Sequence, residues 1–226
     1  METEDTAMLI QSLHPSSSHM AAPVTQFDPV LRSLLAKARP CAVSFYNPNE
    51  AIYGQGETSG PLYLVEFGTV RICRLTADGR RQINSFHFAG EVFGFEPGRE
   101  HQNYAESVDG TGIRLLRPNS DARLGEDALT IALRTMARIQ DHLLLLGRMN
   151  ASEKMAAFLV DLHERQDADR IIDLSMQRND IADYLGLTFE TVSRVLKTLK
   201  DARLIRLPTV SQIEVLDLAG LCGLAE

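Results

Sequence analysis

The stretch Ser175–Arg206, SMQRNDIADYLGLTFETVSRVLKTLKDARLIR, decides how the rest of the chain is understood. Apolar residues at Ile181 and Leu185 predict a short helix with one buried side. Asn179 or Asp180 is expected to cap the start of that helix, because short polar side chains accept hydrogen bonds from the first free backbone N–H groups. The stretch therefore begins with a compact, half-buried helix.

A sharp turn and a second helix follow. Gly186 supplies the left-handed backbone angle that ends a helix, and Thr188 is placed to cap the next one. The inward stripe of the second helix is expected to be Val192, Val195, Leu196 and Leu199. Its outward face then consists of Glu190, Thr191, Ser193, Arg194, Lys197 and Lys200. Two helices joined in this way form a helix-turn-helix, whose second helix enters the major groove of DNA.

Charge supports an interaction with nucleic acid. Residues 178–206 contain six cations and four anions, whereas the whole chain has a net charge of −7. A positive segment on an acidic protein favours attraction to phosphate at one surface, so double-stranded DNA is the expected partner. A winged helix that serves only protein contacts remains the alternative.

The segment DIADYLGLTFETVSRVLKTLKDARLI resembles the DNA-binding signature of the CRP/FNR superfamily of bacterial transcription regulators. Its Glu190-x-x-Ser193-Arg194 core is the form found in the FNR and FixK branches. The resemblance implies that Glu190 accepts from a cytosine or adenine amino group and that Arg194 donates to guanine. Ser193 or Thr191 would adjust recognition of the base step between the Glu190 and Arg194 contacts. The half-site that the resemblance implies is TTGAT-like.

Other residues of the motif are expected to meet the sugar–phosphate backbone. The predicted phosphate contacts are Thr188, Lys197, Lys200 and Arg178. Asp183 is predicted to lie on the outward side of the first helix, where that helix crosses the backbone. Its carboxylate would then repel phosphate, and we expect Asp183 to be a charge-sensitive, regulatory position unless Arg178 or Lys197 pairs with it.

Composition predicts a soluble, cytoplasmic protein. The chain has 226 residues, 44% of them hydrophobic, and no apolar run long enough to span a bilayer. Its first residues are acidic where a secretory signal would be basic. Cys41, Cys73 and Cys222 form no zinc or disulfide pattern, and the cysteine set of an FNR-type iron–sulfur cluster is missing. We therefore expect no metal and no cofactor.

The first half of the chain is predicted to be a β-roll. Alternating apolar runs read as strands at 42–46, 61–75, 80–88, 91–95 and 112–117, after a short helix that Asp28 caps and Pro29 begins. DGRRQINSFHFAGEVFGFEPG resembles the sensory roll of the same superfamily. The expected fold is α+β: a mobile tail at 1–22, an antiparallel, jelly-roll-like β-roll at 23–121, a dimerisation helix at 122–150 and a winged helix-turn-helix at 151–226.

The roll lacks features that a sensor or an enzyme would need. Rolls that bind cyclic AMP follow a Gly-Glu pair with an Arg-Ser pair at the phosphate, and here Gly90-Glu91 is followed only by HQNYAESV. An unpaired phosphate in a closed pocket is costly, so Glu91 is expected to be structural. His87 stands alone in its strand, which favours a core histidine over a metal or haem ligand. No group of residues has a spacing typical of a catalytic site, so we do not expect the protein to be an enzyme.

A heptad seam follows the roll. The seam residues, spaced by three and four, are Leu129, Ala132, Met136, Ile139, Leu143 and Leu146. Leu133, Leu144 and Leu145 are expected to pack back on the roll. A helix that is apolar on two sides needs two partners, and a second copy of itself is the simplest second partner. A single helix buried in a monomer is the alternative.

The resemblance extends to how such proteins act. The loop GEVFGFEPG resembles the one that FNR-type activators press against RNA polymerase, and Glu96 is expected to be its exposed acid. The sequence thus predicts a homodimeric activator of the FixK kind, acting on genes for low-oxygen respiration, nitrogen fixation or denitrification. The competing hypothesis is a regulator that is switched by a small effector bound in the roll.

Overall fold

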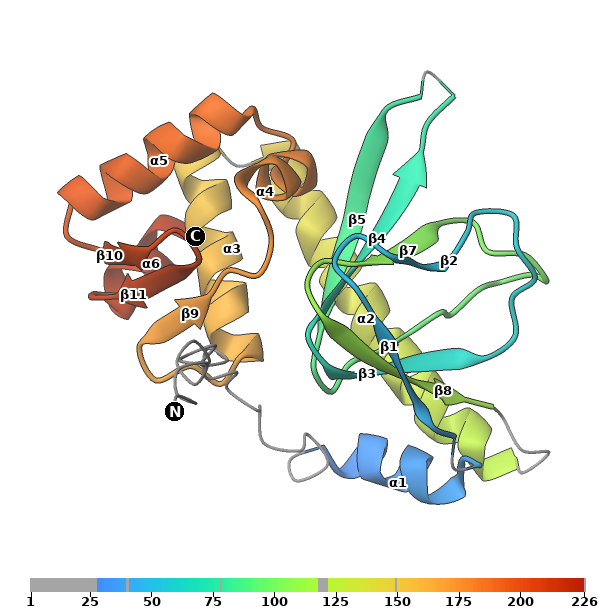
Figure 1. Ribbon diagram of the computed structural model, residues 1–226. Helices are drawn as coiled ribbons and strands as arrows, with labels where there is room; N and C mark the ends of the chain where they lie inside the picture. The colour runs from blue at the N-terminus through green and yellow to red at the C-terminus, as the bar shows by residue number, and fades with distance from the viewer. Residues whose placement is uncertain (1–27, 40, 78, 118–121, 149, 226) are drawn as a thin grey trace, which may run out of the picture.

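The computed structural model describes residues 28–39, 41–77, 79–117, 122–148 and 150–225 (Figure 1). The predicted tail at 1–22 lies outside these residues. Helix α1, Pro29–Lys37, begins as expected, because the Asp28 side chain accepts from the Val30 N–H at 2.8 Å and proline occupies the first turn. Its buried Leu31 and Leu34 pack against the roll and the long helix α2, Ala122–Arg148.

The β-roll consists of two four-stranded antiparallel sheets. One sheet has the order β1-β8-β3-β6, formed by Val43–Tyr46, Thr111–Leu116, Leu62–Phe67 and Val92–Phe93. The other has the order β2-β7-β4-β5, formed by Ala51–Tyr53, Tyr104–Ser107, Thr69–Leu75 and Arg81–Phe88. Strands β2 and β7 were not predicted. The predicted roll is otherwise confirmed.

Aromatic and aliphatic side chains fill the space between the two sheets. Phe93 stacks on Tyr63 with ring centroids 5.2 Å apart, beside the buried Val65, Val70 and Ile113. Gly68 joins β3 to β4 with φ +82°, and a Cβ there would lie 2.7 Å from the Gly110 carbonyl oxygen. Only glycine fits this close, left-handed turn, which places β3 and β4 in different sheets.

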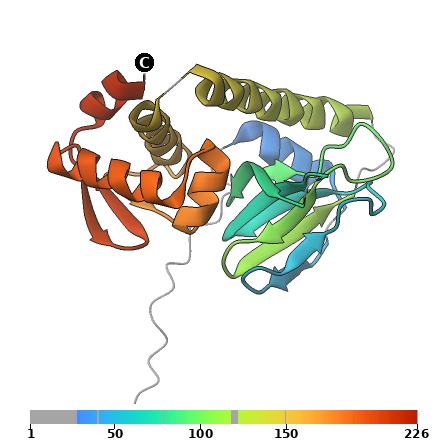
Figure 2. The ribbon, with the colours of Figure 1, turned by 90° about the horizontal axis from the view of Figure 1, so that it is seen from above.

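Helix α2, Ala122–Arg148, runs along the roll and connects it to the C-terminal elements (Figure 2). Ala128 and Ile131 pack against the core shared with α1. Helix α3, Ala151–Arg165, follows, with Asn150 and Glu153 forming a capping box. This cap sets the start of α3 at Ala151.

The C-terminal elements are a helix-turn-helix and a wing. They comprise α4 Arg178–Leu185, α5 Phe189–Asp201, α6 Leu218–Ala225 and the sheet β10-β11-β9, formed by Ile205–Thr209, Gln212–Val215 and Ile171–Asp173. Their hydrophobic core includes Cys73, Ile83, Phe86 and Phe88 from the roll, so the two halves share one buried cluster. The predicted fold class is confirmed. Within the described part of the chain, no helix has the length and apolar character needed to cross a bilayer.

Candidate nucleic-acid interface

Helix α4 ends as expected, but it begins differently from the prediction. Gly186 has φ 62° and ψ 40°, the left-handed conformation that ends α4. The start of α4 corrects the prediction, because Gln177 is the capping residue and makes no side-chain cap hydrogen bond. Asn179 lies inside the helix, and the Asp180 carboxylate is engaged elsewhere.

Helix α5 is held by a cap at its N-terminus and by one buried side. The Thr188 hydroxyl accepts from the Thr191 N–H at 3.2 Å and caps the helix. The side chains that hold α5 on the core are the expected ones, Val192, Val195, Leu196 and Leu199, and all four are buried. The cap and the stripe together fix which face of α5 is left in solvent.

That outward face gathers the predicted reading residues. Glu190, Ser193, Arg194, Lys197 and Lys200 are exposed, and Thr191 is half-buried. The Glu190 backbone N–H and the Thr188 hydroxyl hold the pKa of the Glu190 carboxyl below its ordinary value, so this side chain is an acceptor at neutral pH. The face thus presents one anionic acceptor and three cationic donors on adjacent turns, as mixed readout of base edges requires.

Arg178 of α4 contacts the wing. The Arg178 guanidinium is half-buried, donates to the Val210 carbonyl at 3.4 Å, and has its pKa lowered by burial. Val210, at the tip of the wing, is 89% exposed. Asp217 accepts from the Gly220 N–H at 2.9 Å at the start of α6. Strand β9, which pairs with β11, was not predicted.

Helix α4 presents its carboxylates to the roll. The Asp180 carboxylate accepts from Arg71 at 2.9 Å and from Arg81 at 2.5 Å, and its side chain is only 5% exposed. Arg81 also binds the Asp183 carboxylate at 2.8 Å, and Gln82 donates to the Asp183 carbonyl at 3.0 Å. The partner of Asp183 is neither Arg178 nor Lys197, as the sequence suggested, because strand β5 lies beside α4 and supplies the cation (Figure 1).

A second ionic contact joins the roll to α2 and α3. Glu91 accepts from Arg165 at 2.7 Å and from Arg138 at 3.0 Å. Burial acts to raise the pKa of Glu91, but the neighbouring Arg165 guanidinium holds it below its ordinary value. Glu91 is therefore a structural carboxylate, as expected, because its oxygens already bind two arginines from other elements.

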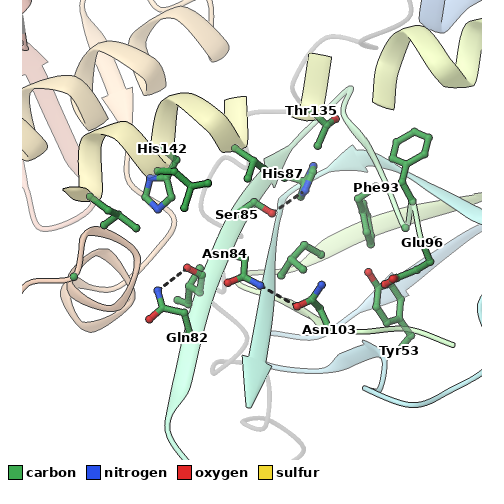
Figure 3. Close-up of a pocket in the computed structure, with 18 residues that line it drawn as sticks. Tyr53, Gln82, Asn84, Ser85, His87, Phe93, Glu96, Asn103, Thr135 and His142 are labelled. Atoms are coloured by element: carbon green, nitrogen blue, oxygen red, sulfur yellow. Dashed lines mark hydrogen bonds between the residues drawn. The ribbon is translucent and has the colours of Figure 1, made fainter. Parts of the chain in front are cut away.

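A cavity of about 460 Å³ lies between the roll and α2. Figure 3 shows side chains of β5 and α2 lining it, including Asn84, Ser85 and Thr135. His87 Nε2 lies 3.1 Å from Ser85 Oγ, and burial lowers the pKa of His87 to about 4, which leaves the ring neutral at neutral pH. Among the described residues that line the cavity there is no lysine or arginine, and Glu96 adds a carboxylate.

Comparisons with known proteins agree with this geometry. Residues 153–224 match the Crp-like helix-turn-helix domain, and residues 43–108 match the cyclic nucleotide-binding domain. The nitrogen fixation regulation protein FixK of Rhizobium meliloti (strain 1021) is 47% identical over 187 residues, covering 81% of this chain and 89% of the relative. The chain belongs to the CRP/FNR family of transcription regulators.

Two further relatives place it among FixK-type regulators. The transcriptional activatory protein AadR of Rhodopseudomonas palustris is 37% identical, over 71% of this chain and 72% of the relative. The structure of FixK2 from Bradyrhizobium japonicum superposes with a TM-score of 0.79 at 35% identity, covering 83% of this chain and 98% of that one. This FixK-type regulator thus carries the helix-turn-helix DNA-binding domain of its family.

Most of the predicted seam of this FixK-type regulator is exposed, but the prediction for two neighbouring leucines is wrong. Leu129, Met136, Ile139 and Leu143 are 44–61% exposed, while Ala132 and Leu146 are half-buried. Leu133 and Leu144 were expected to pack on the roll, but they are 51% and 59% exposed. The roll is contacted by Ala128 and Ile131 instead, so the outer apolar face of α2 is broader than a two-residue heptad seam.

Glu96 also differs from the prediction. Its side chain is 7% exposed, accepts from the Gln102 N–H at 3.1 Å and lies 3.3 Å from His101 Nδ1. The loop folds inward at this residue because the buried His101 ring, stacked on Tyr53, needs a polar partner. Glu96 is therefore unsuited to a surface contact with polymerase, whereas Glu100, two residues after the segment, is exposed.

Proposed function

We propose that this FixK-type regulator is a cytoplasmic homodimer that binds a two-fold DNA palindrome with TTGAT-like half-sites and recruits RNA polymerase as an activator. Its targets are genes for low-oxygen respiration, nitrogen fixation or denitrification. The exposed face of α5, capped by Thr188 and held by its buried stripe, carries the proposal. The relatives' names, nitrogen fixation regulation protein and transcriptional activatory protein, support the gene set and the direction of control.

The side chains of α5 divide into two roles. Glu190 accepts from a base amino group and Arg194 donates to guanine, with Ser193 and Thr191 beside them. Lys197 and Lys200, farther along the same exposed face, contact phosphates and position the helix in the groove. Thr188 and Arg178 add phosphate contacts at the start of α5 and next to the wing, respectively.

Dimerisation through α2 supports palindrome recognition. Six large apolar side chains of this one helix are 44–61% exposed: Leu129, Leu133, Met136, Ile139, Leu143 and Leu144. Removing such a face from water favours pairing by about 25 cal/mol for each Å² of apolar surface buried. Two α5 helices related by a two-fold axis would enter successive major grooves about 34 Å apart.

Selection of bound duplexes from a random pool by the full-length protein, without added effector, tests the proposal. We expect enrichment of an inverted repeat with TTGAT-like halves, and protection of both halves. Recovery of single half-sites would overturn the dimer, and failure to enrich any sequence would overturn sequence-specific binding.

The seam has its own test. Met136→Glu or Leu143→Glu places like charges at the centre of the proposed contact, so the dimer should dissociate and binding to the palindrome should collapse. Leu75→Glu is a matched control, because Leu75 on β4 is 52% exposed and lies outside α2. Sedimentation should give monomers for the two α2 variants and dimers for the control. Dimers in all three variants would place the interface elsewhere.

The cavity favours a second candidate function, a regulator switched by a small effector. Its volume falls within the range of small-molecule sites, and Asn84, Ser85 and Asn103 offer neutral polar contacts. Because its described lining supplies no cation, the phosphate of a cyclic nucleotide would stay unpaired, and a neutral ligand fits better. We propose that DNA binding needs neither a cyclic nucleotide nor an iron–sulfur cluster. Tight palindrome binding without effector, with no heat of binding for cyclic AMP, supports this; DNA binding that requires an added ligand supports the switch.

A further inference from the structure

Helix α2 contacts the helix-turn-helix through a histidine. The His142 ring of α2 stacks on the Tyr184 ring of α4, with centroids 3.9 Å apart and planes 7° from parallel. One turn later in α2, Leu146 lies against the turn between α4 and α5, where a Cβ on Gly186 would be 3.5 Å from Leu146 Cδ2. The helix of the proposed dimer contact therefore packs directly on the unit that carries α5.

The Tyr184 ring also contacts two other parts of the molecule. The buried Phe86 of β5 lies edge-on to Tyr184 with centroids 5.2 Å apart, and the buried Phe158 of α3 lies 5.7 Å from it. Together with His142, these rings form an aromatic cluster to which the roll, α2, α3 and α4 each contribute one side chain. His142 is the member that links the cluster to α2.

The His142 ring is neutral where it stacks. Burial lowers the pKa of His142, and a hydrogen bond to the Tyr184 backbone opposes that effect only in part. The Nε2 atom of His142 is buried and makes no hydrogen bond with another described residue. A neutral ring lies face to face on a phenol without bringing a buried charge, so the contact is an aromatic pair.

His142 is adjacent to the exposed apolar face of α2. The next residue, Leu143, is 61% exposed and belongs to the seam that we assign to the dimer. Because a two-fold axis relates the protomers, rotation of the helix-turn-helix at this contact would move both α5 helices and change their separation. We propose that the stacking of His142 on Tyr184 sets this separation, so that His142 is a positioning residue that selects the spacing between half-sites. This inference rests on the proposed function.

Half-site spacing tests the contact, because a merely structural role would not change the preferred spacing. Full-length protein is titrated against the selected palindrome and against duplexes whose half-sites are one base pair closer or farther apart, a shift of about 3.4 Å along the helix axis. Reaching a displaced half-site requires rotation of the domain, which breaks the stack in both protomers. Without the two stacks, His142→Ala should prefer the selected spacing about tenfold less than the wild type, with affinity for random DNA unchanged.

Substitutions at both rings assign the effect to the stack. His142→Phe and Tyr184→Phe keep a pair of stacked rings and should retain the spacing preference, whereas Tyr184→Leu should lose it as His142→Ala does. His163→Ala is the matched control, because it removes a half-buried histidine of α3 that is outside the aromatic cluster. Sedimentation should show dimers for every variant, which separates this effect from loss of the seam.

The outcomes separate this inference from the proposed function. A His142→Ala dimer with an undiminished spacing preference overturns the inference, even when palindrome binding is intact. A wild-type protein that binds all three spacings equally also overturns it, as do monomers of His142→Ala, which would place His142 in the dimer contact. Failure to enrich any palindrome overturns the proposed function itself, and the inference with it.

Discussion

The two helices of the helix-turn-helix use charge in opposite ways. On α4, the Asp180 and Asp183 carboxylates are bound by Arg71 and Arg81 of the roll. On α5, Arg194, Lys197 and Lys200 are exposed, and none forms an ion pair with another described residue. One helix is thus fixed to the protein by its charges, and the other keeps its charges available for a partner.

This difference changes the charge of the reading surface. Residues 178–206 contain four acidic side chains, and the roll neutralises two of them. Glu190 and Asp201 are then the acids of this segment that face solvent, against the exposed cations of α5. The surface available to phosphate is therefore more positive than the sum over the segment suggests.

The largest effect is expected from Asp180→Asn. The substitution removes the Asp180 carboxylate from Arg71, which is 8% exposed and keeps Glu106 as a partner, and from Arg81, which keeps Asp183. The cost should therefore stay below about 3–5 kcal/mol, the cost of a buried charge left unpaired. Asp201→Asn makes the same change at an exposed position and should cost little. The free energy of unfolding in urea is the measurement. Equal stability of the two variants would show that the α4 contact does not hold the domains together.

Arg194→Ala should affect binding rather than stability. Loss of a base contact is expected to weaken binding to the palindrome by about 1–3 kcal/mol, with random DNA nearly unaffected, and Glu190→Ala should behave alike. Fluorescence anisotropy on both duplexes gives the two affinities. An equal loss on specific and random DNA contradicts the assignment of Arg194 to a base.

Lys200→Ala should weaken all DNA to the same small degree. If each protomer loses one phosphate contact, the slope of log K against log salt should become shallower by about 2 for the dimer, near 0.9 for each contact. Arg74→Ala removes an exposed cation of the roll and serves as the control. A change in sequence preference without a change in slope would place Lys200 at the bases.

Asp183→Asn is expected to have the smallest effect. Its carboxylate is 37% exposed and bound to Arg81, so the lost pair is worth about 0–1 kcal/mol of stability. Affinity for DNA at low salt should change by less than about twofold, because the carboxylate is turned to the roll. A severalfold gain that disappears as salt is added would restore the DNA-facing position that the sequence alone suggested.

Local signals in the sequence determined the ends and faces of the elements. Asp28-Pro29, Gly186 and Thr188 act through backbone angles and hydrogen bonds within a few residues, so their roles were predictable without any partner. The buried stripe of α5 follows from helical periodicity in the same way. The exposed face of α5 could therefore be assigned from the order of residues alone.

The tertiary structure decided where the remaining charged and apolar side chains point. Arg71 and Arg81 lie about a hundred positions before Asp180, and no local pattern connects them. Glu96 turns inward because of His101, and Leu133 stays exposed because α1 and the roll occupy a different side of α2. Periodicity shows that a face exists, but which surface covers it depends on long-range packing, so Asp183 and Glu96 were placed correctly only once the fold was known.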